Sequence, residues 1–226
     1  QMCIRDRYEI LEIPDSSEAG LQDLFHEKGW GDGLPMIAPT RERVEEMLSA
    51  SQDLDPDEVI ASLPPRNGVA TRRIIAVNAV MAGCRPEHFP VLVSAIRALS
   101  APEMNLRGVN ATTHCVAPLL IVHGKAARDG NYNSGLGAFG PGNLANAATG
   151  RAVRLTLLHV AGATPGVGDA STQGSPAKYS YCVAENLDSS PWGGYARTVG
   201  IDDESAVTVH CGCLLYTSPS PRDLAR

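Results

Sequence analysis

Three side chains in the second half of the sequence have the chemistry of a catalytic site: Cys182, His114 and Glu185. If the segment around Cys182 is a strand, its alternation places Lys178 and Cys182 on one face. A lysine there would lower the thiol pKa and favour a nucleophilic thiolate. His114 precedes an apolar segment and suits a general base near neutral pH, and Glu185 follows the Cys182 strand. The alternatives are a buried apolar cysteine and a histidine that only satisfies backbone groups in a turn.

Glycine-rich loops accompany these residues, because eleven glycines lie between Gly124 and Gly174. Glycine permits tight turns and close approach of the backbone to a ligand. The loop that leads to Asn143 would offer free amides at a helix start to an anion, and the loop 162–174 would act as a lid or grip. Plain turns and a plain surface connection are the alternatives for the two loops. The expected substrate contacts are Asp32, Asn110, Gly135, Gly137, Gly140, Asn143, Asp169, Ser171, Thr172 and Lys178.

The segment Gly135-Leu-Gly-Ala-Phe-Gly140 matches the dinucleotide motif G-x-G-x-x-G only formally. That motif needs a strand directly before it, a helix opening within it and an acidic residue about twenty positions on. Here the expected strand ends near His123, and Pro141 follows the third glycine. No cysteine and histidine spacing fits a metal site either, so we expect no cofactor and no metal. The histidines other than His114 are interpreted as surface or structural residues: His26, His88, His123, His159 and His210.

Several segments together resemble an uncharacterised bacterial family over roughly residues 20–210. They are Gly29-Trp-Gly-Asp-Gly-Leu-Pro35, Ala79-Val-Met-Ala-Gly-Cys84, Gly108-Val-Asn-Ala-Thr-Thr-His114, Gly140-Pro-Gly-Asn143, Ala145-Asn-Ala-Ala-Thr-Gly-Arg151, Lys178-Tyr to Glu185-Asn186, and Ser190-Pro-Trp192. This family accompanies, or is fused to, a small UGSC-like domain with a Sec/Cys-Gly-Ser-Cys motif. The resemblance implies thiol or selenol chemistry, and this chain lacks the Sec/Cys-Gly-Ser-Cys motif itself, so the redox centre could lie on a partner protein.

The sequence therefore predicts an enzyme with a thiol-dependent site that acts on a small, anionic molecule. A reductase, a lyase and a hydrolase all remain open as its reaction type. The alternative is a non-catalytic ligand-binding subunit that serves a separate thiol or selenol redox protein.

Composition excludes several other classes of protein. The net charge is −6, and no run of Lys and Arg marks a nucleic-acid binder. The apolar run from Val116 to Val122 is far shorter than the roughly 18–20 residues of a membrane span, and no secretory signal opens the chain. The six cysteines are scattered rather than arranged as a disulfide framework, which favours the reducing cytoplasm.

Both ends of the chain resemble translated sequencing-adapter sequence, namely residues 1–7 and 213–226. We exclude them from the fold and expect a single domain over residues 8–212, truncated at its C-terminus. Hydrophobic patterning predicts an α/β or α+β fold, with helices packed on a mixed sheet. The expected helices are 17–28, 40–49, 71–82, 86–99 and 143–160. The expected strands are 58–63, 106–110, 116–122, 178–184 and 206–210. Pro118 counts against a central position for the strand 116–122.

Overall fold

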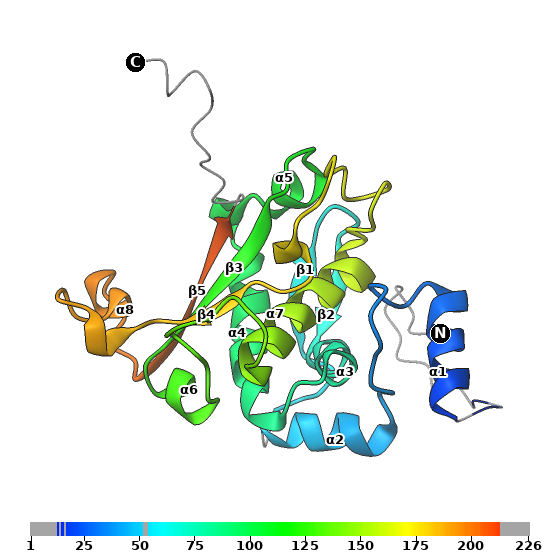
Figure 1. The fold of residues 1–226 in the computed structure, drawn as a ribbon, viewed down its shortest axis with the longest axis horizontal. Coiled ribbons are helices and arrows are strands. Elements are labelled where there is room, and N and C mark those ends of the chain that lie inside the picture. Colours follow the sequence, from blue (N-terminus) through cyan, green and yellow to red (C-terminus); the bar gives the residue numbers. More distant parts are fainter. Residues whose placement is uncertain (1–12, 14, 16, 52–53, 213–226) are drawn as a thin grey trace.

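A computed structural model describes residues 13, 15, 17–51 and 54–212 (Figure 1). Its helices are α1 (Glu18–Lys28), α2 (Arg41–Ser49), α3 (Arg72–Ala82), α4 (Phe89–Leu99), α5 (Leu106–Ala111), α6 (Gly124–Asp129), α7 (Leu144–Thr156) and α8 (Tyr195–Thr198). Its strands are β1 (Val59–Leu63), β2 (Gly68–Thr71), β3 (Ala117–His123), β4 (Cys182–Ala184) and β5 (Ser205–Gly212). Together they form an α+β fold, as predicted. The expectations for residues 1–7 and 213–226 concern segments outside the described residues.

The strands form a hairpin of β1 and β2 and a separate mixed sheet in the order β4-β3-β5. In the mixed sheet, β3 is parallel to β4 and antiparallel to β5. The strand that contains Pro118 is therefore central, contrary to the expectation. The proline is tolerated because β4 pairs only with Leu120–Val122, so no residue of β4 pairs with Pro118.

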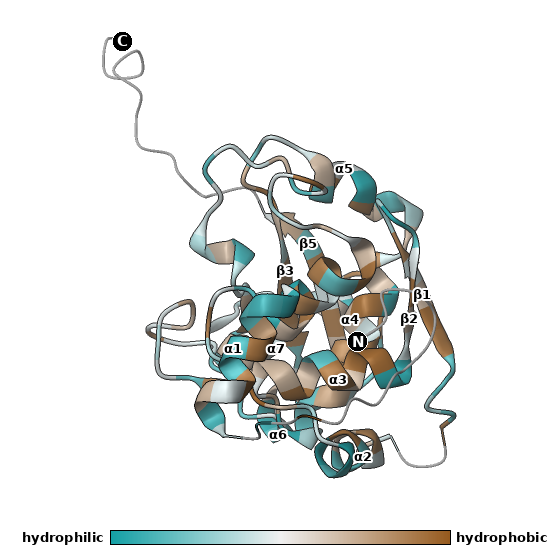
Figure 2. Cartoon of the chain, turned by 90° about the vertical axis from the view of Figure 1, so that its right-hand side faces the viewer, coloured by the Kyte–Doolittle hydropathy of each residue, from teal (hydrophilic) through white to brown (hydrophobic). Residues whose placement is uncertain are grey.

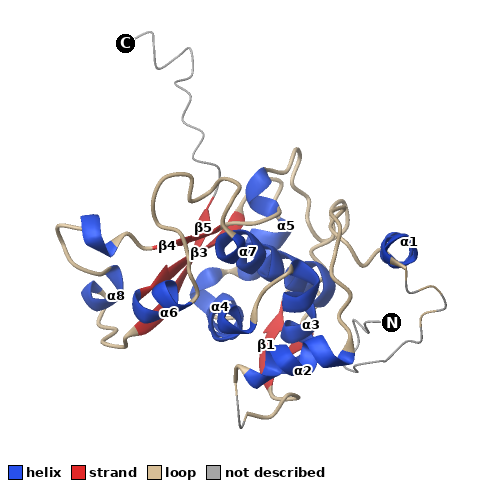
Figure 3. Ribbon diagram, turned by 60° about the horizontal axis from the view of Figure 1, so that its bottom comes forward, coloured by secondary structure: helices blue, strands red, loops and turns tan. Residues whose placement is uncertain are grey.

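A helical layer covers one face of this sheet (Figure 3). Helix α4 packs against β5, and α7 packs against β4. Leu120 and Val122 point into this layer and are fully buried, whereas Leu119 and Ile121 are only half-buried. The face of β3 with Leu120 and Val122 is therefore more deeply buried than the face with Leu119 and Ile121.

Helix α3 is the centre of the core, and its apolar surface is visible among the neighbouring helices (Figure 2). Thr71 caps it at the N-terminus by accepting a hydrogen bond from the Ile74 amide, and Gly83 ends it with φ 88°. Helix α7 packs on α3 and also contacts the segment that leads into β4. A Cβ at Gly150 would come within 2.6 Å of the Tyr181 nitrogen, so only glycine allows this approach.

Two expected strands differ in the structure. Residues 106–110 belong to helix α5, because Asn105 adopts a left-handed conformation (φ 44°) and its side chain accepts a hydrogen bond from the Gly108 amide. The expected strand 178–184 is reduced to β4, since residues Pro176–Lys178 form a 3₁₀ turn. Lys178 therefore does not share a strand face with Cys182, which removes the basis for an activated thiol.

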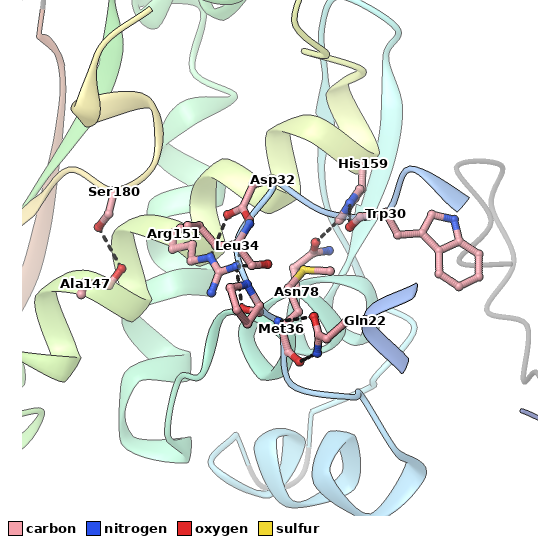
Figure 4. Close-up of polar contacts among 11 residues, drawn as sticks. Gln22, Trp30, Asp32, Leu34, Met36, Asn78, Ala147, Arg151, His159 and Ser180 are labelled. Carbon is pink, nitrogen blue, oxygen red and sulfur yellow. Dashed lines mark hydrogen bonds and ion pairs between the residues drawn. The ribbon is translucent and has the colours of Figure 1, made fainter. Parts of the chain in front are cut away.

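A buried histidine ties the N-terminal loop to the core (Figure 4). His159 lies in a π-helical turn (Leu157–Ala161) that follows α7. Its Nδ1 lies 2.7 Å from Asn78 Oδ1, and its Nε2 lies 2.7 Å from the Trp30 carbonyl oxygen. Burial lowers the pKa of His159 to about 4, although the hydrogen bond to Trp30 acts in the opposite direction.

This histidine should make the protein less stable in acid. Between pH 6.5 and about 4 the unfolded chain protonates this histidine, while the folded protein keeps it neutral. The unfolded state then binds more protons, so the free energy of unfolding falls as the pH drops through this window. Urea unfolding at pH 6.5 and at about pH 4 measures the free energy of unfolding at the two ends of this window. The decrease between the two pH values should be smaller in His159→Gln than in the wild-type protein, by roughly 1–3 kcal/mol. The exposed His26→Gln is the control, and equal losses in all three proteins would contradict the prediction.

Candidate functional site

The three predicted catalytic residues do not gather around one pocket. Cys182 lies on the edge strand β4 and pairs with Leu120 at the midpoint of β3, and Glu185 lies beyond β4, near the carboxyl end of β3. His114 is exposed in the loop before the opposite end of β3. A strand of seven residues spans about 20 Å, so Glu185 and His114 belong to opposite ends of the sheet. His114 lies six residues before Leu120, the strand partner of Cys182, and no hydrogen bond joins His114 and Cys182 in the described structure.

Cys182 is also in the wrong environment for a nucleophile. Its side chain is buried, and burial raises the pKa of its thiol to about 12. Lys178, which was expected to lower that pKa, binds Asp169 instead. These observations favour the alternative of a small apolar core residue.

Alkylation tests this assignment of Cys182. At about pH 7.5, iodoacetamide should leave Cys182 unmodified in the folded protein and modify it after denaturation, because only a thiolate reacts readily. Peptide mass spectrometry reads out each cysteine, and the half-buried Cys115 serves as the internal comparison. Rapid alkylation of Cys182 in the folded protein would restore it as a nucleophile.

Two predicted substrate-binding carboxylates are engaged in ion pairs within the protein. Asp32 binds the Arg151 guanidinium through both oxygens, at 2.7 and 2.9 Å (Figure 4). This pair attaches the loop after α1 to helix α7. Asp169 is buried and binds both Arg154, at 2.9 Å, and Lys178, at 2.8 Å. Both carboxylates therefore hold loops onto the core rather than face a ligand.

The other predicted binding residues make internal hydrogen bonds as well. Asn110 is buried and donates to the Pro64 carbonyl oxygen at 2.8 Å. Thr172 donates to Thr113, and Ser171 accepts from the Gly174 amide. Asn143 caps α7 by accepting from the Asn146 amide.

The loop with Gly135, Gly137 and Gly140 is closed by its own turns, in which the Gly140 amide donates to the Gly137 carbonyl. These contacts favour turns and loop anchoring over a ligand site.

Glu185 belongs to a different constellation, at the carboxyl ends of β3 and β4. Its Oε2 lies 2.6 Å from Nδ1 of His123, and its Oε1 accepts a 2.6 Å hydrogen bond from the Tyr195 amide. His123 is buried, and its Nε2 lies 2.8 Å from Oγ1 of Thr208 on β5. Because an ionised carboxylate only accepts, Nδ1 is the donor toward Glu185, whereas the Thr208 hydroxyl can either donate to Nε2 or accept from it. A continuous hydrogen-bonded chain thus connects a carboxylate, an imidazole and a hydroxyl.

The hydrogen-bonded residues Glu185 and His123 line a pocket of about 670 Å³. Three segments line it: the end of β3 with helix α6, the segment that follows β4 through α8, and the residues just before β5. The lining residues are His123, Gly124, Lys125, Arg128, Asp129, Glu185, Leu187, Gly194, Ala196, Arg197, Asp203 and Glu204. The turn at Gly124 needs glycine, because φ is 65° and a Cβ would lie 2.1 Å from the Glu204 carbonyl oxygen.

Residue types and spacing indicate Glu185 but miss His123, Thr208 and the arginines at the pocket. The interpretation of His123 as a structural or surface residue rests on the lack of another histidine or cysteine at a paired spacing. A signal is nevertheless present: His123 and Glu185 each follow the apolar part of an expected strand. The carboxyl ends of parallel strands meet at one sheet edge, where α/β proteins bind their ligands.

Comparison with known proteins found no match among protein-family models, curated proteins or solved structures. None of the helices in residues 17–51 and 54–212 is both long and apolar enough to span a bilayer. Within the same residues, no cluster of three or more His, Cys, Asp or Glu side chains could hold a metal ion.

Proposed function

We propose that this chain is an enzyme that moves a proton to or from a small molecule bearing an acidic group, with Glu185 as the acid–base residue. The observation that carries the proposal is the Glu185 carboxylate, which lies in the pocket wall and is held 2.6 Å from the buried His123. A catalytic base needs this kind of fixed carboxylate beside a cavity. The proposal keeps the predicted enzyme and the predicted Glu185, and it replaces thiol chemistry with proton transfer.

The neighbours of Glu185 support its role. Each oxygen of the carboxylate accepts one short hydrogen bond, from Tyr195 or from His123, which leaves lone pairs available to a substrate proton. The Tyr195 ring stacks on His123, with ring centroids 6.2 Å apart, and holds the imidazole in place. Thr208 Oγ1 lies 2.8 Å from Nε2 of the ring and restrains it from the other side. His123 is therefore a positioning residue that orients the carboxylate and stabilises its charge.

The pocket also contains groups that bind acidic substrates. Arg128 and Arg197 line it, and in the described part of the chain neither forms an ion pair. Lys125, by contrast, is bound to Asp129. A free guanidinium binds a carboxylate or phosphate with two parallel hydrogen bonds, which fixes the orientation of the ligand. These arginines would hold the acidic group while Glu185 takes a neighbouring proton.

Deuterium exchange tests the proposal across many candidate substrates at once. Wild-type protein is incubated in D₂O with a panel of small hydroxy, keto and amino acids, and proton NMR follows each carbon-bound proton. A compound whose proton Glu185 abstracts should lose that signal as solvent deuterium replaces it. Compounds that bind without exchanging would identify a ligand-binding subunit and contradict the proposal, as would a panel in which nothing exchanges.

A further inference from the structure

The charged groups of the pocket fit more than an acidic ligand. Its lining contains Asp203 and Glu204 in addition to the two arginines, the Lys125–Asp129 pair and Glu185. Asp203 and Glu204 are exposed, and within the described residues their carboxylates form no ion pair. Acidic side chains thus outnumber basic ones by one in this pocket.

This balance argues against a ligand that carries only negative charge. A site for a plain anion has an excess of positive potential, which attracts the ligand and avoids repulsion from nearby carboxylates. Here a carboxylate at Arg128 or Arg197 would lie in the same cavity as Asp203 and Glu204. A positively charged group on the same ligand would turn that repulsion into attraction.

We infer that the ligand is zwitterionic and carries both a carboxylate and an ammonium group, as an amino acid does. The guanidinium groups of Arg128 and Arg197 bind the carboxylate, and Asp203 and Glu204 bind the ammonium. Leu187 and Ala196 supply the apolar part of the lining, against which a small side chain packs. This inference rests on the proposed function, because it names the substrate class of the same pocket.

Matched ligand trios provide the test, with affinities measured by calorimetry on the full chain. One trio is alanine, propionate and ethylamine, and the other is leucine, 4-methylpentanoate and 3-methylbutylamine. In at least one trio the amino acid should bind about tenfold more tightly than the carboxylate or the amine. Each of those two ligands lacks one charge-assisted contact, and such a contact contributes about that factor to the affinity. The inference would be overturned if, in both trios, the plain carboxylate or the amine bound as tightly as the amino acid. It would also be overturned if no ligand of either trio bound.

Two double variants assign the charges. The double variant Arg128→Ala with Arg197→Ala should weaken binding of the amino acid about tenfold or more. The double variant Asp203→Asn with Glu204→Gln should bind the amino acid no more tightly than the plain carboxylate. If proton exchange persists without a preference for zwitterions, only this inference fails. If the preference persists and Glu185→Gln still exchanges protons, only the proposed function fails.

Discussion

Glu185→Gln should lower the rate of substrate proton exchange by roughly 100- to 10,000-fold, the usual contribution of a general base. The amide is nearly isosteric with the carboxylate, so its oxygen still accepts from the Tyr195 amide. Its NH₂ group can donate to Nδ1 of His123 once that ring adopts the other tautomer and donates from Nε2 to Thr208. The fold is therefore retained, while the group that accepts the substrate proton is lost.

The measurement is the NMR exchange rate of a compound that the wild-type protein turns over, together with a melting curve of each variant. Glu103→Gln is the matched control, because Glu103 is exposed in the 3₁₀ turn Pro102–Met104 and does not line the pocket. Its exchange rate should equal that of the wild-type protein. An unchanged rate in Glu185→Gln would rule out Glu185 as the acid–base residue.

Asp169→Ala should lower the free energy of unfolding by about 3–5 kcal/mol, the usual result of removing one partner from a buried ion pair. The Asp169 side chain is 2% exposed, and the Arg154 and Lys178 side chains that bind it are 9% and 11% exposed. Without the carboxylate, two cations would remain in the interior with little to compensate them. Burial already lowers the pKa of Arg154, and the charge of Asp169 opposes that effect. The amide of Ser171 would also lose its acceptor.

Urea unfolding of Asp169→Ala measures this loss, with Asp57→Ala as the control. Asp57 binds Arg73 at the surface and is 67% exposed, so its removal should cost less than about 1 kcal/mol. If Asp169→Ala proves too unstable to purify, Asp169→Asn keeps the shape and should still be less stable than Asp57→Ala. Equal stability of the Asp57 and Asp169 variants would show that the buried network contributes nothing.

Local signals in the sequence predict much of the fold. Thr40 caps α2, and Gly83 ends α3 in the left-handed region, as expected from residue type alone. Helix α5 is mistaken for a strand because its six residues are too few to show a helical period. Strand β4 is predicted too long because a proline turn precedes it, and alternation alone does not show where pairing begins.

The candidate site is less predictable, because it depends on which strands become neighbours. The place of Glu185 after an expected strand is enough to indicate it. His123 escapes prediction, since its partner lies 62 positions away and no spacing rule connects them. The loops are polar and rich in glycine, yet Asp32, Asp169 and Asn110 all bind groups of the protein itself. Residue type does not distinguish a carboxylate that binds a ligand from one that anchors a loop.

The short hydrogen bond from the Tyr195 amide to Glu185 gives the site a built-in spectroscopic reporter. An amide proton held 2.6 Å from a carboxylate oxygen, measured between the heavy atoms, resonates far downfield, and it moves back when a proton arrives on that oxygen. One cross-peak in a nitrogen-15 spectrum should therefore follow the charge on Glu185 during ligand addition.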